Sequence, residues 1–542
     1  MKKNLIAFMA LLASANFASA QTIDLTTLPE ASFEHFWSVG CGAGRANEGL
    51  RIDWMEHLAQ AHKDCGFQTV RMHGLFHDDM HICHLDRNGN MTYSWQYVDV
   101  LFDNMLKIGV RPFVELGFFP EELTIPESKK QFWWKANVTV VPKTFDMWHD
   151  LVLNFTQHVV DRYGIDEIKT WYFEVWNEPN LNPGFLDGTK SDYFRLYKEA
   201  VTAIKSVDPA LKVGGPSTSN FTADTRYHGE IVDLNKSIFY NDDIINEQQW
   251  EGSWIVDFLE YCEAEDLPVD FISTHPYPTD YALDPDLKRG RSATRYIHST
   301  RDDIQWLNDR LAESKYPDAE IHLTEWSTSP SSRDAMHDEL PPAAFIMKVN
   351  LENIGKTNSL MYWTFTDVFE EQGGGSTVFH GGFGMFNLQG IAKPSYHAYR
   401  MLNQLGDKMI YNADPVCVTR NSKNDKIVAL AYNYPEEYIQ AVPAGKDVKH
   451  YMEASSKQLD LKVEGMAPNA AVFVEVLNNE NGNVMSTFRG MGKPHSPTRE
   501  QIEMLKQSSW NTQKISMQAD ENGVLSISRE LTPWECVLIT EL

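Results

Sequence analysis

Two glutamates stand where an apolar, strand-like segment opens into a loop. Glu178 lies in the segment WNEP (176–179) and Glu325 in the segment TEW (324–326). A single glutamate in such a place is more often solvated or ion-paired than reactive. Two carboxylates that meet across a small pocket are what glycosidic bond cleavage needs, because one must protonate the leaving oxygen while the other attacks the anomeric carbon. The charge on one carboxylate raises the pKa of the other and so keeps the acid protonated.

A second polar cluster lies in the segment HGLFHDDMHICH (73–84), which holds four histidines, two aspartates and a cysteine. Such a cluster raises the question of a metal site. The segment has no HExxH motif, which would place two ligands on one helix face. We interpret Asp78 and Asp79 as residues that structure the loop or its rim. The others after His73 are interpreted as polar loop residues that bind no metal: His77, His81, Cys83 and His84.

The two glutamates need a scaffold that brings distant strand ends together. From about residue 33 to residue 400, short apolar segments typical of strands alternate with amphipathic helical segments. This alternation favours a (β/α)8 barrel, whose active site lies at the C-terminal ends of the strands. A doubly wound sheet is the alternative, but the sequence has no Gly-rich phosphate turn to support it. Eight strands are expected, at or near residues 36–40, 67–74, 110–118, 168–179, 211–217, 269–277, 320–327 and 359–367. Strands four and seven, which carry the glutamates, face each other across such a barrel.

The character of the chain changes at about residue 405. Segments such as KIVALAYNY (426–434) and AAVFVEVLNN (470–479) follow one another without intervening helices. This pattern predicts a β-sandwich over residues 405–542, packed on a catalytic barrel of residues 21–404. The first residues after position 20 are a candidate segment to pair with the sandwich. The long polar stretch 222–253 follows the fifth strand, where a loop of this length is usually functional or mobile.

Charge and composition restrict the partners. The chain of 542 residues has 48 Lys and Arg against 75 Asp and Glu, a net charge of −27. This charge would repel a nucleic acid or an anionic membrane surface, whereas it does not disfavour a neutral substrate. Aromatic residues make up 12% of the chain, and Trp and Tyr suit stacking on sugar rings. The sequence carries no signal for an oligomeric state.

The N-terminus predicts export. Residues 1–20 (MKKNLIAFMALLASANFASA) combine a basic start, an apolar run too short to span a bilayer and an A-x-A cleavage pattern, which together are typical of a signal peptide. We therefore expect a periplasmic or secreted protein. The six cysteines form no CxxC pair and are too sparse for a disulfide scaffold. One or two bridges are compatible with export, and Cys417 and Cys536 are the candidate pair.

Several segments together resemble glycoside hydrolase family 39, and its β-xylosidase branch in particular. The resemblance spans nearly the whole mature chain, and it is more specific for the family than for the sugar. It is carried by VGCGAGRANEGLRIDW (39–54), RMHGLFHDDM (71–80), FWWKANVT (132–139), FEVWNEPNL (173–181), STHPYP (273–278), YWTFTDVFEEQG (362–373), HGGFGMFNLQGIAKPSYHAYRML (380–402) and NGNVMSTFRGMGKPHSPTREQIEML (481–505).

This resemblance implies roles for the matching residues. Glu178 would be the general acid/base and Glu325 the nucleophile of a retaining double displacement, with Asn177 hydrogen-bonded to the sugar 2-OH. Tyr277 would hydrogen-bond the nucleophile and Arg71 would lie near it, since a phenol and a cation keep a carboxylate ionised. Further substrate contacts are implied for His73, for His275, for Trp363 as a hydrophobic floor, and for Glu370 and Glu371 at outer hydroxyls. The family mechanism needs no metal and no cofactor.

The resemblance predicts a retaining exo-glycosidase that removes terminal sugars from plant-type oligo- or polysaccharides, and β-D-xylose is the favoured sugar. The same chemistry on an α-L-arabinoside or an α-L-iduronide is an alternative. A uronate would need a cation at its carboxylate, for which Lys288, Arg289 and Arg291 are candidates. Glu370 and Glu371 would repel a uronate. A non-catalytic carbohydrate-binding barrel is the third alternative, because fold alone does not decide function. The intact pair Glu178 and Glu325 argues against it.

Overall fold

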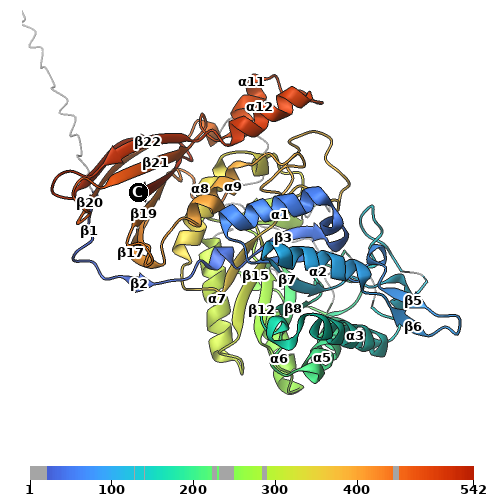
Figure 1. The fold of residues 1–542 in the computed structure, drawn as a ribbon. Helices are drawn as coiled ribbons and strands as arrows, with labels where there is room; N and C mark the ends of the chain where they lie inside the picture. Colours follow the sequence, from blue (N-terminus) through green and yellow to red (C-terminus); the bar gives the residue numbers. More distant parts are fainter. Residues whose placement is uncertain are drawn as a thin grey trace, which may run out of the picture.

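Eight parallel strands close into a barrel, with helices around its outside (Figure 1). The structure is a computed structural model, and it describes residues 21–126, 128–138, 141–182, 184–222, 229–230, 249–283, 290–442 and 451–542. In chain order, the barrel strands are β3 (Gly40–Arg45), β4 (Thr69–His73), β7 (Arg111–Leu116), β8 (Tyr172–Val175), β9 (Lys212–Ser219), β12 (Phe271–His275), β15 (Glu320–Trp326) and β16 (Ser359–Tyr362). The main helices between and after them are α1 (Ile52–Cys65), α2 (Gln96–Ile108), α3 (Phe145–Tyr163), α5 (Lys190–Val207), α6 (Ile255–Ala264), α7 (Ser299–Glu313), α8 (Pro341–Glu352) and α9 (Pro394–Leu402). The predicted (β/α)8 barrel is confirmed.

The first barrel strand differs from the prediction. Residues 36–38 form a short 3-10 helix, and the strand is the Gly-rich segment Gly40–Arg45. Glycine disfavours strands, so the apolar pattern pointed to the wrong residues. Packing explains the composition, because a Cβ at Gly40 would lie 2.5 Å from Thr69 Oγ1 and one at Gly42 would lie 2.2 Å from the Trp363 ring. Strand β3 is therefore built from small residues to leave room for its neighbours.

Three two-stranded ribbons decorate the loops that leave the C-terminal ends of the barrel strands. They are β5 (Cys83–Leu85) with β6 (Met91–Tyr93), β10 (Phe221–Thr222) with β11 (Glu251–Gly252), and β13 (Thr279–Leu283) with β14 (Gly290–Thr294). Most of the polar stretch 222–253 lies outside the described residues, as do Lys288 and Arg289.

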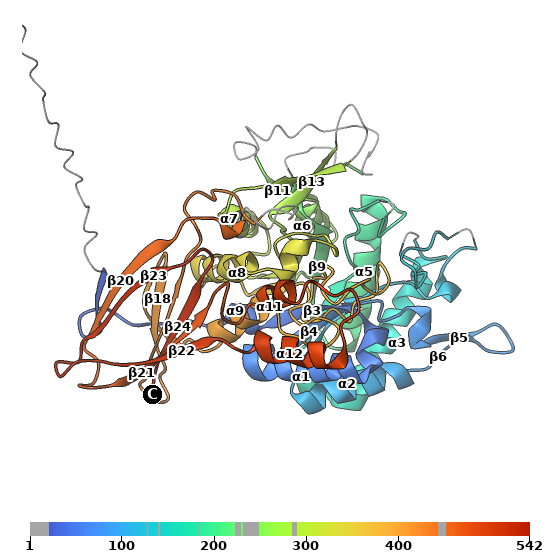
Figure 2. The same ribbon diagram turned by 90° about the horizontal axis from the view of Figure 1, so that it is seen from above.

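The C-terminal region forms two facing sheets, as predicted, and the N-terminal residues join both (Figures 1 and 2). The larger sheet has the order β2-β17-β18-β19-β24-β21-β22 and the smaller one the order β1-β20-β23. Their core holds apolar side chains from both sheets, such as Leu461 and Val474. The strands are β1 (Gln21–Asp24), β2 (Ala31–Ser32), β17 (Lys408–Ala413), β18 (Val416–Arg420), β19 (Ile427–Tyr432), β20 (Lys457–Glu464), β21 (Ala471–Leu477), β22 (Gln513–Gln518), β23 (Leu525–Leu531) and β24 (Cys536–Glu541).

Strand β19 joins the sandwich to the barrel. All six of its residues are buried, although a strand on a solvated sheet would bury only alternate ones. Ile427 and Ala429 belong to the sandwich core, whereas Val428, Leu430 and Tyr432 belong to the cluster that continues into the barrel. Its second face packs on α8, a helix that is itself buried almost throughout. The continuous apolar run in the sequence thus reflects two buried faces.

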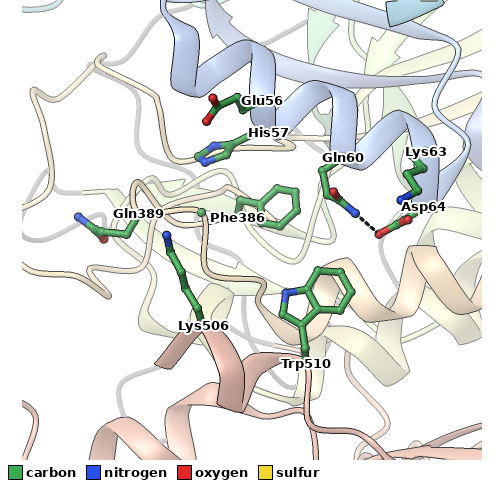
Figure 3. A pocket seen from close by; sticks show the side chains of 10 residues that line it. Glu56, His57, Gln60, Lys63, Asp64, Phe386, Gln389, Lys506 and Trp510 are labelled. Atoms are coloured by element: carbon green, nitrogen blue, oxygen red, sulfur yellow. Dashed lines mark hydrogen bonds between the residues drawn. The ribbon is translucent and has the colours of Figure 1, made fainter. Parts of the chain in front are cut away.

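Two helices interrupt the sandwich and were not predicted. Helices α11 (Val484–Gly490) and α12 (Arg499–Ser509) lie between β21 and β22 and approach the barrel near α1 and α9. Between α12 and the barrel lies a pocket of about 580 Å³, where side chains of α1 face Lys506 and Trp510 (Figure 3). Its lining contains none of the predicted catalytic residues, so this pocket marks the joint between the two regions.

The structure corrects the expected disulfide. All six cysteines are free. Cys417 on β18 and Cys536 on β24 both border β19, where they pair with Leu430 and Tyr432. Because one strand separates them, their strands lie roughly 9 to 10 Å apart, and the two cysteines are also offset by two residues along β19, so a disulfide cannot span the distance.

We expect Gly42→Ala to lower the free energy of unfolding by about 1 to 3 kcal/mol and to reduce activity, because the new methyl group overlaps the Trp363 ring. The matched control is Gly490→Ala, whose Cβ meets nothing within 4 Å and which should leave stability equal or slightly raised. Urea unfolding of the two variants measures the difference. Equal midpoints would show that Trp363 moves aside freely.

Candidate active site

A buried arginine organises the C-terminal mouth of the barrel. Arg71 on β4 is fully buried, and its Nε donates to Glu174 Oε2 at 2.5 Å. Its Nη1 donates to Glu325 Oε1 at 2.8 Å, while Nη2 donates to Asn177 Oδ1 at 2.8 Å and to Ser217 Oγ at 3.1 Å. A single cation therefore ties together residues from β8, from the loop that follows it, from β9 and from β15.

The two predicted catalytic carboxylates meet at this mouth. One carboxyl oxygen of Glu178, one carboxyl oxygen of Glu325 and one ring nitrogen of His275 all lie within 4.8 Å of one another. Retaining glycosidases hold their two carboxyl groups about 5 to 5.5 Å apart, whereas inverting ones need room for a water molecule. The short separation fits a nucleophile and an acid/base on opposite sides of one anomeric carbon.

The loop after β8 holds Glu178 in an unusual backbone conformation, with φ at 45°. Its N–H donates to Ser217 O at 2.8 Å, which fastens the loop to β9. Asn180 completes the fastening, since its side chain donates to Ser219 O at 2.9 Å and accepts from Ser219 N at 2.8 Å. Positive φ at a non-glycine residue is costly and persists only where the surroundings enforce it. These bonds supply that enforcement and fix the direction of the carboxyl group.

Glu178 is the carboxyl group suited to hold a proton. Burial raises its pKa to about 7, and a hydrogen bond from Ser219 opposes the rise only in part. His275 Nδ1 lies 2.9 Å from Glu178 Oε1, and burial lowers the pKa of His275 to about 4, so this imidazole is neutral at neutral pH. Glu178 therefore has no permanent cation beside it, and it can donate a proton near pH 7.

Glu325 has the opposite surroundings. Burial raises its pKa as well, but the positive charge of Arg71 acts against that rise. Arg71 binds one of its oxygens, and Tyr277 donates to the other, Oε2, at 3.0 Å. The two donors stabilise the ionised form, which is the form a nucleophile needs.

Asn177 offers a free donor to the site. Its Oδ1 is used by Arg71, whereas its Nδ2 is buried and has no hydrogen-bond partner among the described residues. A buried amide N–H without a partner is costly, so this group is suited to a substrate oxygen.

The floor of the site is aromatic. Trp363 forms a buried cluster with Tyr277, Phe369 and Phe383. The ring of His73 lies 4.7 Å from the Trp363 ring. This surface can support a sugar ring and keeps water away from the carboxylates.

The two predicted outer glutamates have different surroundings. Glu370 is paired with Arg45 at 2.6 Å and with Arg51 at 3.1 Å. Glu371 faces the interior, with Oε1 3.7 Å from His73 Nε2, and burial raises its pKa well above the ordinary value. Of the two, Glu371 is the one that the structure brings next to the catalytic pair.

The other polar residues of segment 73–84 make separate contacts and do not form one cluster. Asp78 accepts a bond from Glu121 N at 2.9 Å, and Asp79 pairs with Arg45, so both aspartates structure the loop. His77 packs edge-on against Trp134, and His84 bonds the backbone of His81. Within the described parts of the chain, the one group with metal-ligand geometry is Glu178, His275 and Glu325. These residues already form the carboxylate site.

Sequence reasoning missed several residues of the site. Glu115 and Glu174 lie in the apolar strands β7 and β8 and are fully buried beside Arg71. Arg45, at the end of β3, pairs with Asp79 and Glu370. The available signal was a charged residue inside an apolar strand, which is rare unless the charge is paired.

The geometry agrees with comparisons to known proteins. The model of the glycosyl hydrolases family 39 matches residues 26–526. The chain belongs to this family. It is 34% identical to a β-xylosidase of Caldicellulosiruptor saccharolyticus over 93% of this chain and 95% of that protein. It is 32% identical to a β-xylosidase of Geobacillus stearothermophilus over 94% and 92%. The crystal structure of a monomeric β-xylosidase from Caulobacter crescentus CB15 superposes with a TM-score of 0.80 at 28% identity, covering 96% of this chain and 98% of that one. This member of family 39 is a glycoside hydrolase of the retaining type.

We expect kcat/KM for an unactivated glycoside to fall as the pH rises through about 7, because Glu178 then loses the proton that the leaving group requires. Glu178→Gln should abolish this descending limb and lower kcat/KM about 10² to 10⁴-fold. A dinitrophenyl glycoside, whose leaving group needs no proton, is the control and should still form the glycosyl-enzyme. A descending limb that persists in Glu178→Gln would assign it to another group.

Proposed function

We propose that the protein is an exo-acting β-D-xylosidase in which Glu178 is the acid/base and Glu325 the nucleophile. In the first step, Glu325 attacks the anomeric carbon while the glycosidic oxygen leaves with the proton of Glu178. In the second step, Glu178 takes a proton from water, whose oxygen displaces Glu325 from the same carbon. The configuration is therefore retained, and each carboxyl group returns to its starting state.

One observation carries these roles: two carboxyl groups within reach of one carbon have unequal surroundings. Glu325 is held by Arg71 and Tyr277, whereas Glu178 contacts a neutral imidazole and has its pKa raised to about 7. Two titratable groups whose environments separate their proton affinities mark an acid and a nucleophile.

The sugar assignment rests on the site and on the relatives. Two relatives that align over more than nine tenths of their length are named β-xylosidases. The aromatic floor and the unpaired Asn177 Nδ2 suit a neutral sugar ring with hydroxyl groups. These features favour a xyloside over an iduronide.

We further propose that the protein is exported. Residues 1–20 have the pattern of a cleaved signal peptide. Among the described residues, none of the helices has the length and apolar character to cross a membrane. N-terminal sequencing of the protein recovered from its natural host should begin at Gln21, and an intact Met1 on the mature protein would contradict export by this route.

The test of the sugar is release of nitrophenol from the aryl β-D-xyloside, measured beside the aryl α-L-arabinosides and the α-L-iduronide. The proposal expects the highest kcat/KM on the xyloside. Activity confined to one of the other glycosides would retain the carboxylate chemistry and overturn the sugar assignment. Proton NMR of the first product formed should show the β-anomer, as retention requires.

We expect Glu325→Gln to lower kcat at least about 10⁴-fold while the protein remains folded, because the amide cannot form the glycosyl ester but fills the same space. Circular dichroism and the urea midpoint serve as the folding control. Turnover that survives in a folded Glu325→Gln protein would remove Glu325 from the mechanism.

A further inference from the structure

Two buried glutamates lie side by side beneath the catalytic pair. Glu115 on β7 and Glu174 on β8 are register partners across the two strands. Their exposed fractions are 1% and 0%. Two adjacent carboxylates in such a place repel each other strongly, so their partners decide which of them is ionised.

Glu174 has the partners that an ionised carboxylate needs. Its Oε2 accepts from Arg71 Nε at 2.5 Å and its Oε1 accepts from Thr324 Oγ1 at 2.8 Å. Although burial alone would raise the pKa of Glu174, the charge and the hydrogen bond of Arg71 help to bring it below its ordinary value.

Glu115 lacks such partners. Arg71 Nη2 lies 3.1 Å from Glu115 Oε2, but it directs its hydrogen bonds to Asn177 and Ser217. Glu115 Oε1 is buried and has no hydrogen-bond partner among the described residues. The remaining contact is His73 Nδ1, at 2.6 Å from Oε2. An ionised carboxylate with one hydrogen bond at this depth is strongly disfavoured.

The other nitrogen of His73 points to the same conclusion. His73 Nε2 lies 3.7 Å from an oxygen of Glu325 and 3.7 Å from an oxygen of Glu371. Facing the ionised nucleophile, this nitrogen is more stable with a hydrogen than with a lone pair. Burial lowers the pKa of His73 to about 4, so the ring carries one hydrogen at neutral pH. With that hydrogen on Nε2, Nδ1 is an acceptor and needs a donor.

We propose that Glu115 is a positioning residue that carries a proton on Oε2. Its O–H donates a hydrogen bond to His73 Nδ1 and thereby holds His73 in the Nε2–H tautomer. The rings of Trp363 and Phe118, 4.7 and 5.7 Å away, lie on the imidazole and limit its rotation. His73 then presents a fixed donor to the mouth of the site. This step rests on the proposed function: the donor binds the oxygen of a sugar hydroxyl. The hydrogen of that hydroxyl is then free to point toward a carboxyl oxygen such as that of Glu371.

Infrared difference spectroscopy of the full-length protein without substrate tests the protonation directly. The difference between wild type and Glu115→Gln should show the loss of a protonated-carboxyl C=O band that shifts in heavy water. The matched control is Glu174→Gln at the partner position, which should remove carboxylate bands instead. Loss of carboxylate bands in Glu115→Gln would overturn the proposal. Because no substrate is present, this outcome is independent of the sugar assignment.

Kinetics test the positioning role. Gln can donate its amide hydrogen to His73 Nδ1, so Glu115→Gln should lower kcat/KM only about 3-fold. Glu115→Leu removes the donor and should lower it about 30-fold, with 15N shifts of labelled His73 reporting a loss of the Nε2–H tautomer. Equal losses in the two folded variants, or a His73 tautomer unchanged in Glu115→Leu, would overturn the role. If Glu115→Leu does not fold, the infrared comparison and the His73 tautomer in Glu115→Gln decide.

Discussion

The buried guanidinium of Arg71 is the interaction on which the rest of the site depends. It is fully buried and surrounded by the carboxyl groups of Glu115, Glu174 and Glu325. A cation at this depth is tolerated only when its hydrogen bonds are satisfied by anions and polar groups. Three different barrel strands supply those glutamates, so the charge balance also fixes how the strands sit around the mouth. The nucleophile is held in place by the same contact that keeps it ionised.

The same arrangement, an ionised glutamate held by Arg71 beside a protonated glutamate, recurs at two depths of the barrel. Near the surface of the mouth, Glu325 has a cation and Glu178 has none, so the proton resides on Glu178. One layer below, Glu174 accepts a hydrogen bond from Arg71, whereas the hydrogen bond of Glu115 is with a neutral imidazole, which places a proton on Glu115. Since one arginine cannot compensate all the carboxylates around it, the protein keeps some of them neutral. The neutral ones then serve as hydrogen-bond donors, a task that a carboxylate cannot perform.

The sequence predicted what depends on apolar periodicity and on local motifs. Seven of the eight barrel strands, the second domain and the meeting of Glu178 with Glu325 follow from such patterns. Strand β3 was missed because its glycines are chosen for the space that Trp363 needs, and this requirement is visible only in three dimensions. Glu115 and Glu174 were missed because their meaning lies in a shared cation on a neighbouring strand. The predicted disulfide between Cys417 and Cys536 was wrong because strand β19 lies between their strands, and this arrangement is not apparent from the spacing of the cysteines in the sequence.

The glycine strand and the proton on Glu178 are connected. Gly42 lets the Trp363 ring lie against β3, and that ring completes the aromatic cluster with Tyr277, Phe369 and Phe383. An apolar floor excludes water from the carboxyl groups, and loss of water is the main cause of the raised pKa of Glu178. A residue without a side chain on the first strand thus contributes to the raised pKa of a glutamate after the fourth. Packing and catalysis are therefore set by the same contacts at this end of the barrel.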